Sequence, residues 1–364
     1  MRRPALQSRA GIALIVVMIA ITVLSILAAA FAFSMKVETK LAQNSSSEAE
    51  LLWLGRSGLE FARYVLAQQL AISSEPYDGL NQVWAGGPGG IGTSNSVLAG
   101  ISLKDYQLGD GKFSIEIKDL ERKWNINVAD QNALEQALRL VGVDAGETAG
   151  IAASVLDWID VDNNTHIGGT ESDYYQTQVP PYFAKNQPID DLSELLLVRG
   201  IGPEIYWGGV ATNHTRAAFQ NRQQPGLLNQ EMPQFAVGLV DLFTPVSNGR
   251  ININTASVSA LQMIPFVDEM VAAKLIELRS GPDGADGTED DMPAGGPGVR
   301  IEDALNSAGL HGQAVPIAAR YCTGRSSTFE VKIEAEVAGY HRTFYGILGR
   351  NSPKDVQILG FYWK

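Results

Sequence analysis

The sequence has a single cysteine, Cys322, among 364 residues. A disulfide within the chain, a CxxC redox motif and a zinc site built on cysteines are therefore excluded. Common enzyme motifs are missing as well, because no Walker loop, HExxH helix or GxSxG turn occurs. The four histidines are scattered along the chain. We predict no enzymatic activity.

Basic side chains are outnumbered by acidic ones. The chain has 28 Lys and Arg residues against 40 Asp and Glu, which gives a formal net charge of -12 and a pI near 4.9. Proteins that bind a phosphate backbone without regard to sequence need clustered positive charge. The composition therefore argues against a nucleic-acid partner.

Charged side chains are absent from the run between Ala10 and Met35. A helix needs roughly 20 consecutive apolar residues to cross a bilayer, whereas the apolar core of a cleavable secretory signal has about 7–15. The run is long enough for a membrane span. Arg2, Arg3 and Arg9 precede it, which by the positive-inside rule predicts a cytoplasmic N-terminus with the rest of the chain outside.

A polar but periodic segment follows the apolar run. Its apolar residues recur at mostly helical spacings among polar ones such as Lys40, Glu48 and Arg56. They are Val37, Leu41, Leu51, Leu52, Leu59, Val65 and Leu66. The pattern predicts that residues 36–70 continue the membrane helix of residues 12–35 as one long stem.

Gly11 stands at the junction between the basic leader and the apolar run. A glycine can simply mark the start of a membrane helix. The segment Arg9-Ala10-Gly11-Ile12 with the apolar residues after it also resembles the leader of type IV pilins and type II secretion pseudopilins. This resemblance implies that a prepilin peptidase removes residues 1–11 by cutting between Gly11 and Ile12, and that the new amino terminus at Ile12 is methylated.

Val16 occupies the fifth position of the implied mature chain. Most pilins and pseudopilins have a glutamate there, which is thought to pair with the amino terminus of the subunit ahead. A lone carboxylate inside the membrane costs roughly 2.5–3.5 kcal/mol, so it is retained where a partner compensates it. Its absence is typical of the K-type minor pseudopilin family, and the resemblance implies a subunit at the tip of the filament.

The remaining sequence predicts a strand-rich head with a helical insertion. Ile101–Leu108 and Phe113–Ile117 alternate in polarity around a Gly-Asp-Gly turn, and Thr328–Val337 and His341–Leu348 alternate in the same way. The section from 129 to 320 is predicted to be mainly helices and loops. We therefore predict an α+β fold in which residues 71–128 and 321–364 form a type IV pilin-like sheet and residues 129–320 form an inserted α-helical domain.

Several segments of the predicted insert resemble the signature of K-type minor pseudopilins. They are Asp157–Asp162, Gly168-Gly169, Glu171–Tyr175, Pro180–Tyr182, Asn186–Pro188 and Ser193–Leu195. Four carboxylates among them, those of Asp160, Asp162, Glu171 and Asp173, surround a glycine-containing loop that also holds His166. Oxygen donors of this kind suit calcium, and the resemblance implies calcium in the insert. A solvated acidic loop, with Asp160 or Asp162 capping a helix, is the alternative.

A second acidic segment has Asp-Gly spacings that suggest a calcium loop. It does not fit the EF-hand pattern, which requires a glutamate at the twelfth position, and a surface loop is the competing interpretation. Its carboxylates are Asp283, Asp286, Glu289, Asp290 and Asp291.

Two segments of the insert resemble helix-hairpin-helix units, Leu196–Pro203 and Ile251–Arg279. DNA-binding versions place backbone N–H groups at a helix N-terminus against a phosphate. The second unit has Phe266-Val267-Asp268-Glu269 where glycines are needed, and its carboxylates would repel a nucleic acid. We interpret both units as structural, and a membrane-anchored DNA receptor remains the rival hypothesis.

The resemblance to K-type minor pseudopilins implies a mechanical function. Such a subunit caps the pseudopilus tip and initiates assembly, in a complex with the I-type and J-type minor pseudopilins. The major pseudopilin, the prepilin peptidase and the inner-membrane assembly platform are the further partners it implies. The expected location is the inner membrane, single-pass with a periplasmic head, and then the pseudopilus tip. A minor pilin of a type IV pilus is the nearest alternative.

Overall fold

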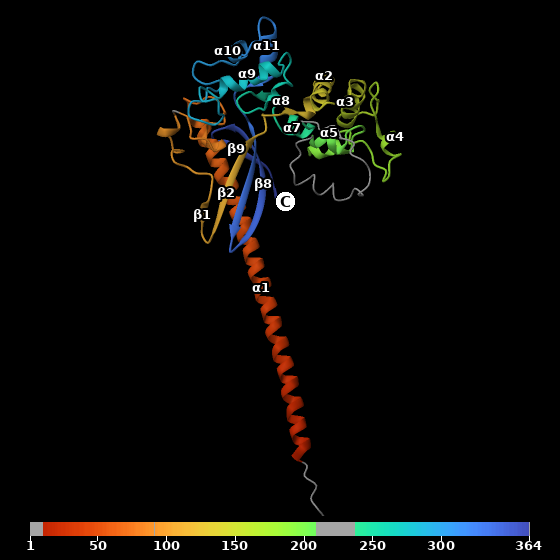
Figure 1. Cartoon of the computed structure of the whole chain (residues 1–364), viewed down its shortest axis with the longest axis vertical. Coiled ribbons are helices and arrows are strands. Elements are labelled where there is room, and N and C mark those ends of the chain that lie inside the picture. The colour runs from red at the N-terminus through yellow and green to blue at the C-terminus, as the bar shows by residue number, and fades with distance from the viewer. Residues whose placement is uncertain (1–9, 91, 209–236, 364) are drawn as a thin grey trace, which may run out of the picture.

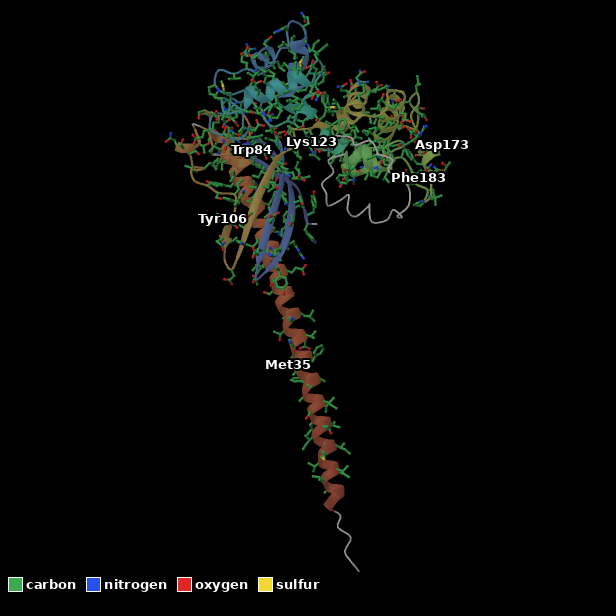
Figure 2. All side chains as sticks on the ribbon, in the orientation of Figure 1. Met35, Trp84, Tyr106, Lys123, Asp173 and Phe183 are labelled. Atoms are coloured by element: carbon green, nitrogen blue, oxygen red, sulfur yellow. The ribbon has the colours of Figure 1, made fainter. Side chains whose placement is uncertain are left out.

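The computed structural model describes residues 10–90, 92–208 and 237–363. A single helix of 62 residues, α1 (Ala10–Ala71), forms a stem whose N-terminal part extends away from the head (Figure 1). This confirms the predicted long helix. Its apolar part is long and apolar enough to cross a membrane. Figure 2 shows Met35 on the part of the stem that the head leaves uncovered, where its side chain is exposed.

A five-stranded antiparallel sheet packs on the C-terminal half of the stem, in the order β1-β2-β7-β8-β9 (Figure 1). The strands are β1 (Tyr106–Leu108), β2 (Gly111–Asp119), β7 (Thr328–Val337), β8 (Tyr340–Ser352) and β9 (Asp355–Trp363). β2 and β7 are more than 200 residues apart in sequence but pair from Gly111 with Val337 to Asp119 with Phe329. In the sequence, the insert therefore connects two strands that are neighbours in the sheet.

The predicted strand from Ile101 to Leu108 is wrong in its first half. Only Tyr106–Leu108 pair with β2, and the chain turns at Asp105, whose φ is +52°. A positive φ is incompatible with a continuing strand, so the alternation of residues 101–105 does not produce one. Instead the Leu103 carbonyl accepts a hydrogen bond from the Ile115 N–H (2.7 Å).

One hydrophobic core lies between the stem and the sheet. The stem contributes Leu54, Leu59, Val65 and Leu66, and the strands contribute the inward-facing residues of their alternating patterns. Two glycines of the stem let the strands approach closely. A Cβ atom on Gly55 would lie 2.5 Å from the Phe344 ring, and one on Gly58 would lie 2.6 Å from the Ile333 side chain.

A second core fills the insert, from Trp124 to Cys322. Its helices are short (Figure 1). They are α2 (Gln131–Val141), α3 (Ala145–Ile159), α4 (Ser172–Tyr175), η4 (Leu192–Leu197), α5 (Pro203–Trp207), α7 (Leu239–Leu242), α8 (Val258–Leu261), α9 (Glu269–Arg279), α10 (Ile301–Ser307) and α11 (Ala314–Ala319). Those from α8 to α11 lie beyond the end of the sheet farthest from the N-terminus, and those from α2 to α7 lie to one side of that end. The whole has the predicted class, a pilin-like α+β fold with a helical insert.

The insert also contains two pairs of short parallel strands. β3 (Trp124–Asn125) pairs with β4 (Phe243–Thr244), and β5 (Ile251–Asn252) pairs with β6 (Cys322–Thr323). Short 3-10 turns, η1 (Val83–Ala85), η2 (Thr93–Asn95) and η3 (Ile126–Val128), complete the described elements.

A buried polar network joins the sheet to the insert at the end of β2. The Asp119 carboxylate, at the last residue of that strand, accepts hydrogen bonds from Asn252 Nδ2 (3.0 Å), Thr255 Oγ1 (2.6 Å) and Ser326 Oγ (2.7 Å). All four side chains are buried. Since unsatisfied buried polar groups are costly, this set fixes where the insert sits on the sheet.

Candidate metal centre in the insert

The candidate centre forms where α3 ends. The helix stops at Ile159, and Asp160 is its C-terminal cap in an extended conformation. The chain then folds back, so that residues 166–171 return to the last turn of α3. Asp157 and Asp160 are three residues apart at this helix end, a spacing that brings both carboxylates to one side.

The buried carboxylate of Asp157 organises this loop. Its Oδ1 accepts a hydrogen bond from the His166 backbone N–H (2.9 Å) and lies 2.5 Å from His166 Nδ1. Its Oδ2 accepts from the Thr170 N–H (2.5 Å). Asp160 Oδ2 lies 3.6 Å from the same imidazole nitrogen. The ligating atoms of Asp157, Asp160 and His166 are all within 4.8 Å of one another, and no other such group occurs among the residues that the structure describes.

Glu171 adds a buried carboxyl group to this site. Its side chain is buried, at 7% exposed, yet neither carboxylate oxygen has a hydrogen-bond partner among the described residues. Burial raises its pKa most, and the negative charge of Asp157 raises it further. The backbone N–H of Ser172 lowers it, and Asp160 and Asp162 have smaller raising effects. A buried carboxylate without a partner is energetically costly. An additional positive charge at this place would remove the cost.

The pKa values of Asp160 and His166 are also shifted in the direction expected for an acidic cluster. The pKa of Asp160 is raised by desolvation and then by the charge of Asp162. The hydrogen bond with Asp157 raises the pKa of His166. A proton on His166 or a bound cation would each relieve the mutual repulsion of the carboxylates.

Of the four carboxylates predicted for this site, Asp160 lies in the close cluster with Asp157 and His166. The charges of Asp160 and Asp162 also raise the pKa of Glu171. Asp173 is different: it lies exposed on the first turn of α4, and no described contact joins it to the others. Figure 2 shows it at the outer edge of the insert, near Phe183. Sequence reasoning did not assign Asp157, although its spacing from Asp160 was the available signal.

Several carboxylates of the second acidic loop make hydrogen bonds or an ion pair with neighbouring protein groups. Asp286 forms a two-pronged ion pair with Arg279, with distances of 2.9 Å from Nε and 2.6 Å from the terminal nitrogen. Burial alone would raise the pKa of Asp286, but this pairing outweighs burial and the pKa is lowered. Asp290 accepts hydrogen bonds from the Asp283 N–H and from Thr288, and Asp291 accepts from the Gly287 N–H. Glu289 is exposed. These bonds close the loop.

The residues predicted for processing lie on the stem. Gly11 and Ile12 are in the first turns of α1, and Val16 follows on the same helix with its side chain 60% exposed. The exposed side chains of this stretch form the apolar surface that a bilayer or a bundle of neighbouring stems would cover.

The helix-hairpin-helix-like units are short. The first consists of the 3-10 helix η4 followed by a turn and α5, which has five residues. In the second, α8 and α9 are joined by a turn with Phe266 at φ +68°. The Asp268 carboxylate accepts a hydrogen bond from the Val271 N–H (2.9 Å) at the start of α9. A carboxylate therefore takes the position that a phosphate would need.

Comparison with known proteins finds similarity to a secretion family. Residues 114–207 match the first-domain model of type II secretion system protein K. This part of the chain is similar to type II secretion system protein K. The matched residues run from β2 to α5 and include Asp157, His166 and Glu171, so the candidate centre lies inside the segment shared with this family.

Individual relatives are distant. Type II secretion system protein K of Klebsiella pneumoniae is 24% identical over 212 residues, which cover 54% of this chain and 59% of the relative. A putative protein K of Escherichia coli K12 is 40% identical over 65 residues, or 18% of this chain and 20% of the relative. The chain thus spans between about a fifth and three fifths of these protein K relatives.

A solved structure shares the fold over nearly the whole chain. The crystal structure of the GspK-GspI-GspJ complex from enterotoxigenic Escherichia coli contains a chain that matches with a TM-score of 0.61 at 18% identity. The match covers 89% of this chain and 99% of the other. The pilin-like fold with a helical insert is therefore shared with a chain of this complex.

Proposed function

We propose that this chain is a K-type minor pseudopilin that caps the tip of a type II secretion pseudopilus and initiates its assembly. The observation that carries the proposal is the position of the insert. The insert connects β2 to β7 in the sequence, and its helices α8–α11 lie beyond the end of the sheet away from the membrane stem (Figure 1). A further subunit stacked above this head would meet the insert, so the fold suits one copy at the end of a filament. The proposal assigns no reaction to the chain.

The proposed topology is a single-pass inner-membrane protein with a cytoplasmic N-terminus and a periplasmic head. The three arginines before the apolar run support this orientation. A prepilin peptidase would cut between Gly11 and Ile12, and Ile12 would be methylated. Mass spectrometry of the protein purified from its membrane tests both steps. An intact leader on the assembled protein would contradict them.

Val16 supports the tip position. An unpaired carboxylate at this depth is costly, and a subunit with nothing ahead of it has no partner for one. We therefore expect Val16→Glu to leave secretion unimproved and to reduce membrane insertion. Improved assembly of the Val16→Glu variant would instead indicate an ordinary filament subunit.

The proposed partners are the I-type and J-type minor pseudopilins in a tip complex, followed by the major pseudopilin and the inner-membrane assembly platform. The fold match to a chain in a GspK-GspI-GspJ complex supports the first two. The test is affinity purification of the full-length chain in detergent with the I-type and J-type proteins of the same organism, with duplex DNA as competitor. A stoichiometric complex that DNA does not disturb is expected.

Two alternatives are decided by the same purification. Binding to DNA without a protein partner would favour a membrane-anchored DNA receptor, although Asp268 and the net charge of -12 oppose it. Assembly with type IV pilins in place of the minor pseudopilins would indicate a minor pilin of a type IV pilus.

We propose further that the insert binds calcium at the end of α3. Asp157, Asp160 and Glu171 would supply carboxylate oxygens, and Asp162 lies beside them. The donor set suits a hard cation, and the uncompensated carboxylate of Glu171 favours one. His166 would lose its short contact with Asp157 or coordinate in its neutral form. Calorimetric titration of the chelator-treated protein with calcium tests this, and an absence of saturable heat would overturn it.

A further inference from the structure

A small apolar pocket opens between α9, α10 and the segment that joins them. Its volume is about 240 Å³. Ile253, Leu275 and Ala294 form a buried part of its wall, while Met292 is 55% exposed at its edge. Sites for small molecules usually have volumes of about 300–1,000 Å³. This pocket is smaller, and its size suits one side chain of a partner.

Of the two charged side chains that line this pocket, one is fully hydrogen-bonded and the other is unpaired among the described residues. The guanidinium of Arg279 is fully engaged by Asp286 and by the carbonyl oxygens of Ile253 and Ala256. Asp303, on the first turn of α10, also lines the pocket, and its side chain has no hydrogen bond or ion pair among the described residues. The pocket therefore offers one free carboxylate.

The chain segment between α9 and α10, which contributes to the pocket wall, is rich in carboxylates. Met292 follows directly on the acidic loop, and its N–H donates to the Arg279 carbonyl (2.7 Å), which holds the loop beside α9. Arg279 and Arg300 are the only basic residues between positions 279 and 307. Both are paired, with Asp286 and Glu302 respectively. The remaining carboxylates of this stretch lack a cationic partner among the described residues.

We propose that this pocket binds a single apolar side chain from an exposed segment of a partner protein, and that Asp303 selects a segment with Lys or Arg next to that side chain. An apolar anchor in a well-packed pocket supplies most of the binding energy in many interfaces. The free carboxylate and its acidic surroundings supply charge complementarity, which sets specificity and association rate.

The position of the pocket separates this interaction from filament packing. α9 and α10 lie at the end of the head farthest from the N-terminus of α1 (Figure 1), whereas the stem and its neighbours lie at the other end. The partner would therefore approach the outer end of the head. This inference goes beyond the proposed role of the chain in assembly and does not depend on calcium.

The experiment uses the full-length protein in detergent with ¹³C-labelled methionine methyl groups, since Met292 lies at the pocket edge. The probes are acetyl-Gly-Leu-Lys-Gly-amide, the same peptide with Glu in place of Lys, and the same peptide with Ser in place of Leu. Met292→Leu identifies the signal. We expect a saturable shift with the Leu-Lys peptide, and an affinity at least about 10-fold lower for the other two.

Two variants separate the pocket from a general charge effect. Asp303→Asn should reduce the preference for Lys over Glu to less than about 3-fold, and Glu302→Gln, in the same helical turn, should leave the preference intact. Ala304→Leu should weaken all apolar peptides by filling the pocket. The proposal is overturned if the Leu-Lys peptide gives no saturable shift, if it binds no better than the Leu-Glu peptide, or if Asp303→Asn and Glu302→Gln behave alike.

Discussion

Arg350 and Asp78 form an ion pair in which the two side chains are only 1% and 2% exposed. The guanidinium also donates to the Ser326 carbonyl (2.7 Å) and to the Leu66 carbonyl (3.3 Å) near the end of the stem. The Arg350 side chain on β8 thereby bonds to the stem at Leu66, to the loop after the stem at Asp78, and to the segment that follows the insert at Ser326. The pair lies where the stem, the sheet and the chain that returns from the insert meet.

Removing one member of this pair should destabilise the head strongly. In Arg350→Met the Asp78 carboxylate stays buried without its cation, and breaking a buried pair in this way costs about 3–5 kcal/mol. Urea unfolding in detergent, followed by tryptophan fluorescence, measures the change. The control is Arg342→Met on the same strand, whose ion pair with Glu48 is more exposed and should contribute less than about 1 kcal/mol. Equal losses in the two variants would contradict the argument.

Asp119 should make the stability of the head depend on pH. Burial, followed by the charge of Glu121, raises the pKa of Asp119 to about 7, and Asp78 adds to the effect. An unfolded aspartate titrates near about 3.9, so between these values the folded protein retains a proton that the unfolded chain has lost. Its contribution to stability is fully present below about pH 4 and is lost as the pH rises towards 7.

The measurement is urea unfolding between pH 5 and 8. We expect the wild-type free energy of unfolding to fall with rising pH, with a contribution from Asp119 of up to roughly 1 kcal/mol per pH unit. Asp119→Asn should remove that contribution. Asp355→Asn is the control, because hydrogen bonds from Asn351 and Gln357 lower the pKa of Asp355 and keep it ionised throughout this range. Parallel slopes for wild type and Asp119→Asn would refute the prediction.

Glu171→Gln should have opposite effects with and without calcium. In chelator at pH 8 the variant no longer buries an unpaired charge, so its melting temperature should rise by about 2–4 °C for a gain near 1 kcal/mol. With calcium, the wild type should gain more than the variant, because ligand binding stabilises the folded state that binds it. Asp173→Asn is the matched control, since that carboxylate is exposed and outside the cluster. It should change neither melting temperature.

The sequence was informative for several features that depend on local periodicity. The long stem, the strand Thr328–Val337 and the helical character of the insert follow from hydrophobic spacing alone, and the stated strand bounds agree with β7. The leader motif and Val16 required the resemblance to pilins. Local spacing contains no information on pairing, so the junction of β2 with β7 could be inferred only from the pilin-like fold.

Features that depend on tertiary contacts were beyond sequence reasoning. Asp105 ends a strand-like alternation through a positive φ, which the pattern of polarity does not encode. Asp157 reads as an ordinary polar residue of a helix, and its role becomes visible only when the loop returns and places His166 and Thr170 against it. The pairing of Asp286 with Arg279 likewise removes a carboxylate from the predicted second ligand set.

The contact between stem and sheet predicts an unusual response to a helix-favouring substitution. Gly→Ala in the middle of a helix usually adds about 1 kcal/mol of stability, and Gly150→Ala in α3 should behave this way, because the nearest atom to its new Cβ would be 3.4 Å away. Gly55→Ala should instead cost about 1–3 kcal/mol, since its Cβ would come within 2.5 Å of the buried Phe344 ring and push the stem from β8. Urea unfolding of both variants measures the change in the free energy of unfolding. A stabilised Gly55→Ala protein would show that the stem and the sheet do not pack this closely.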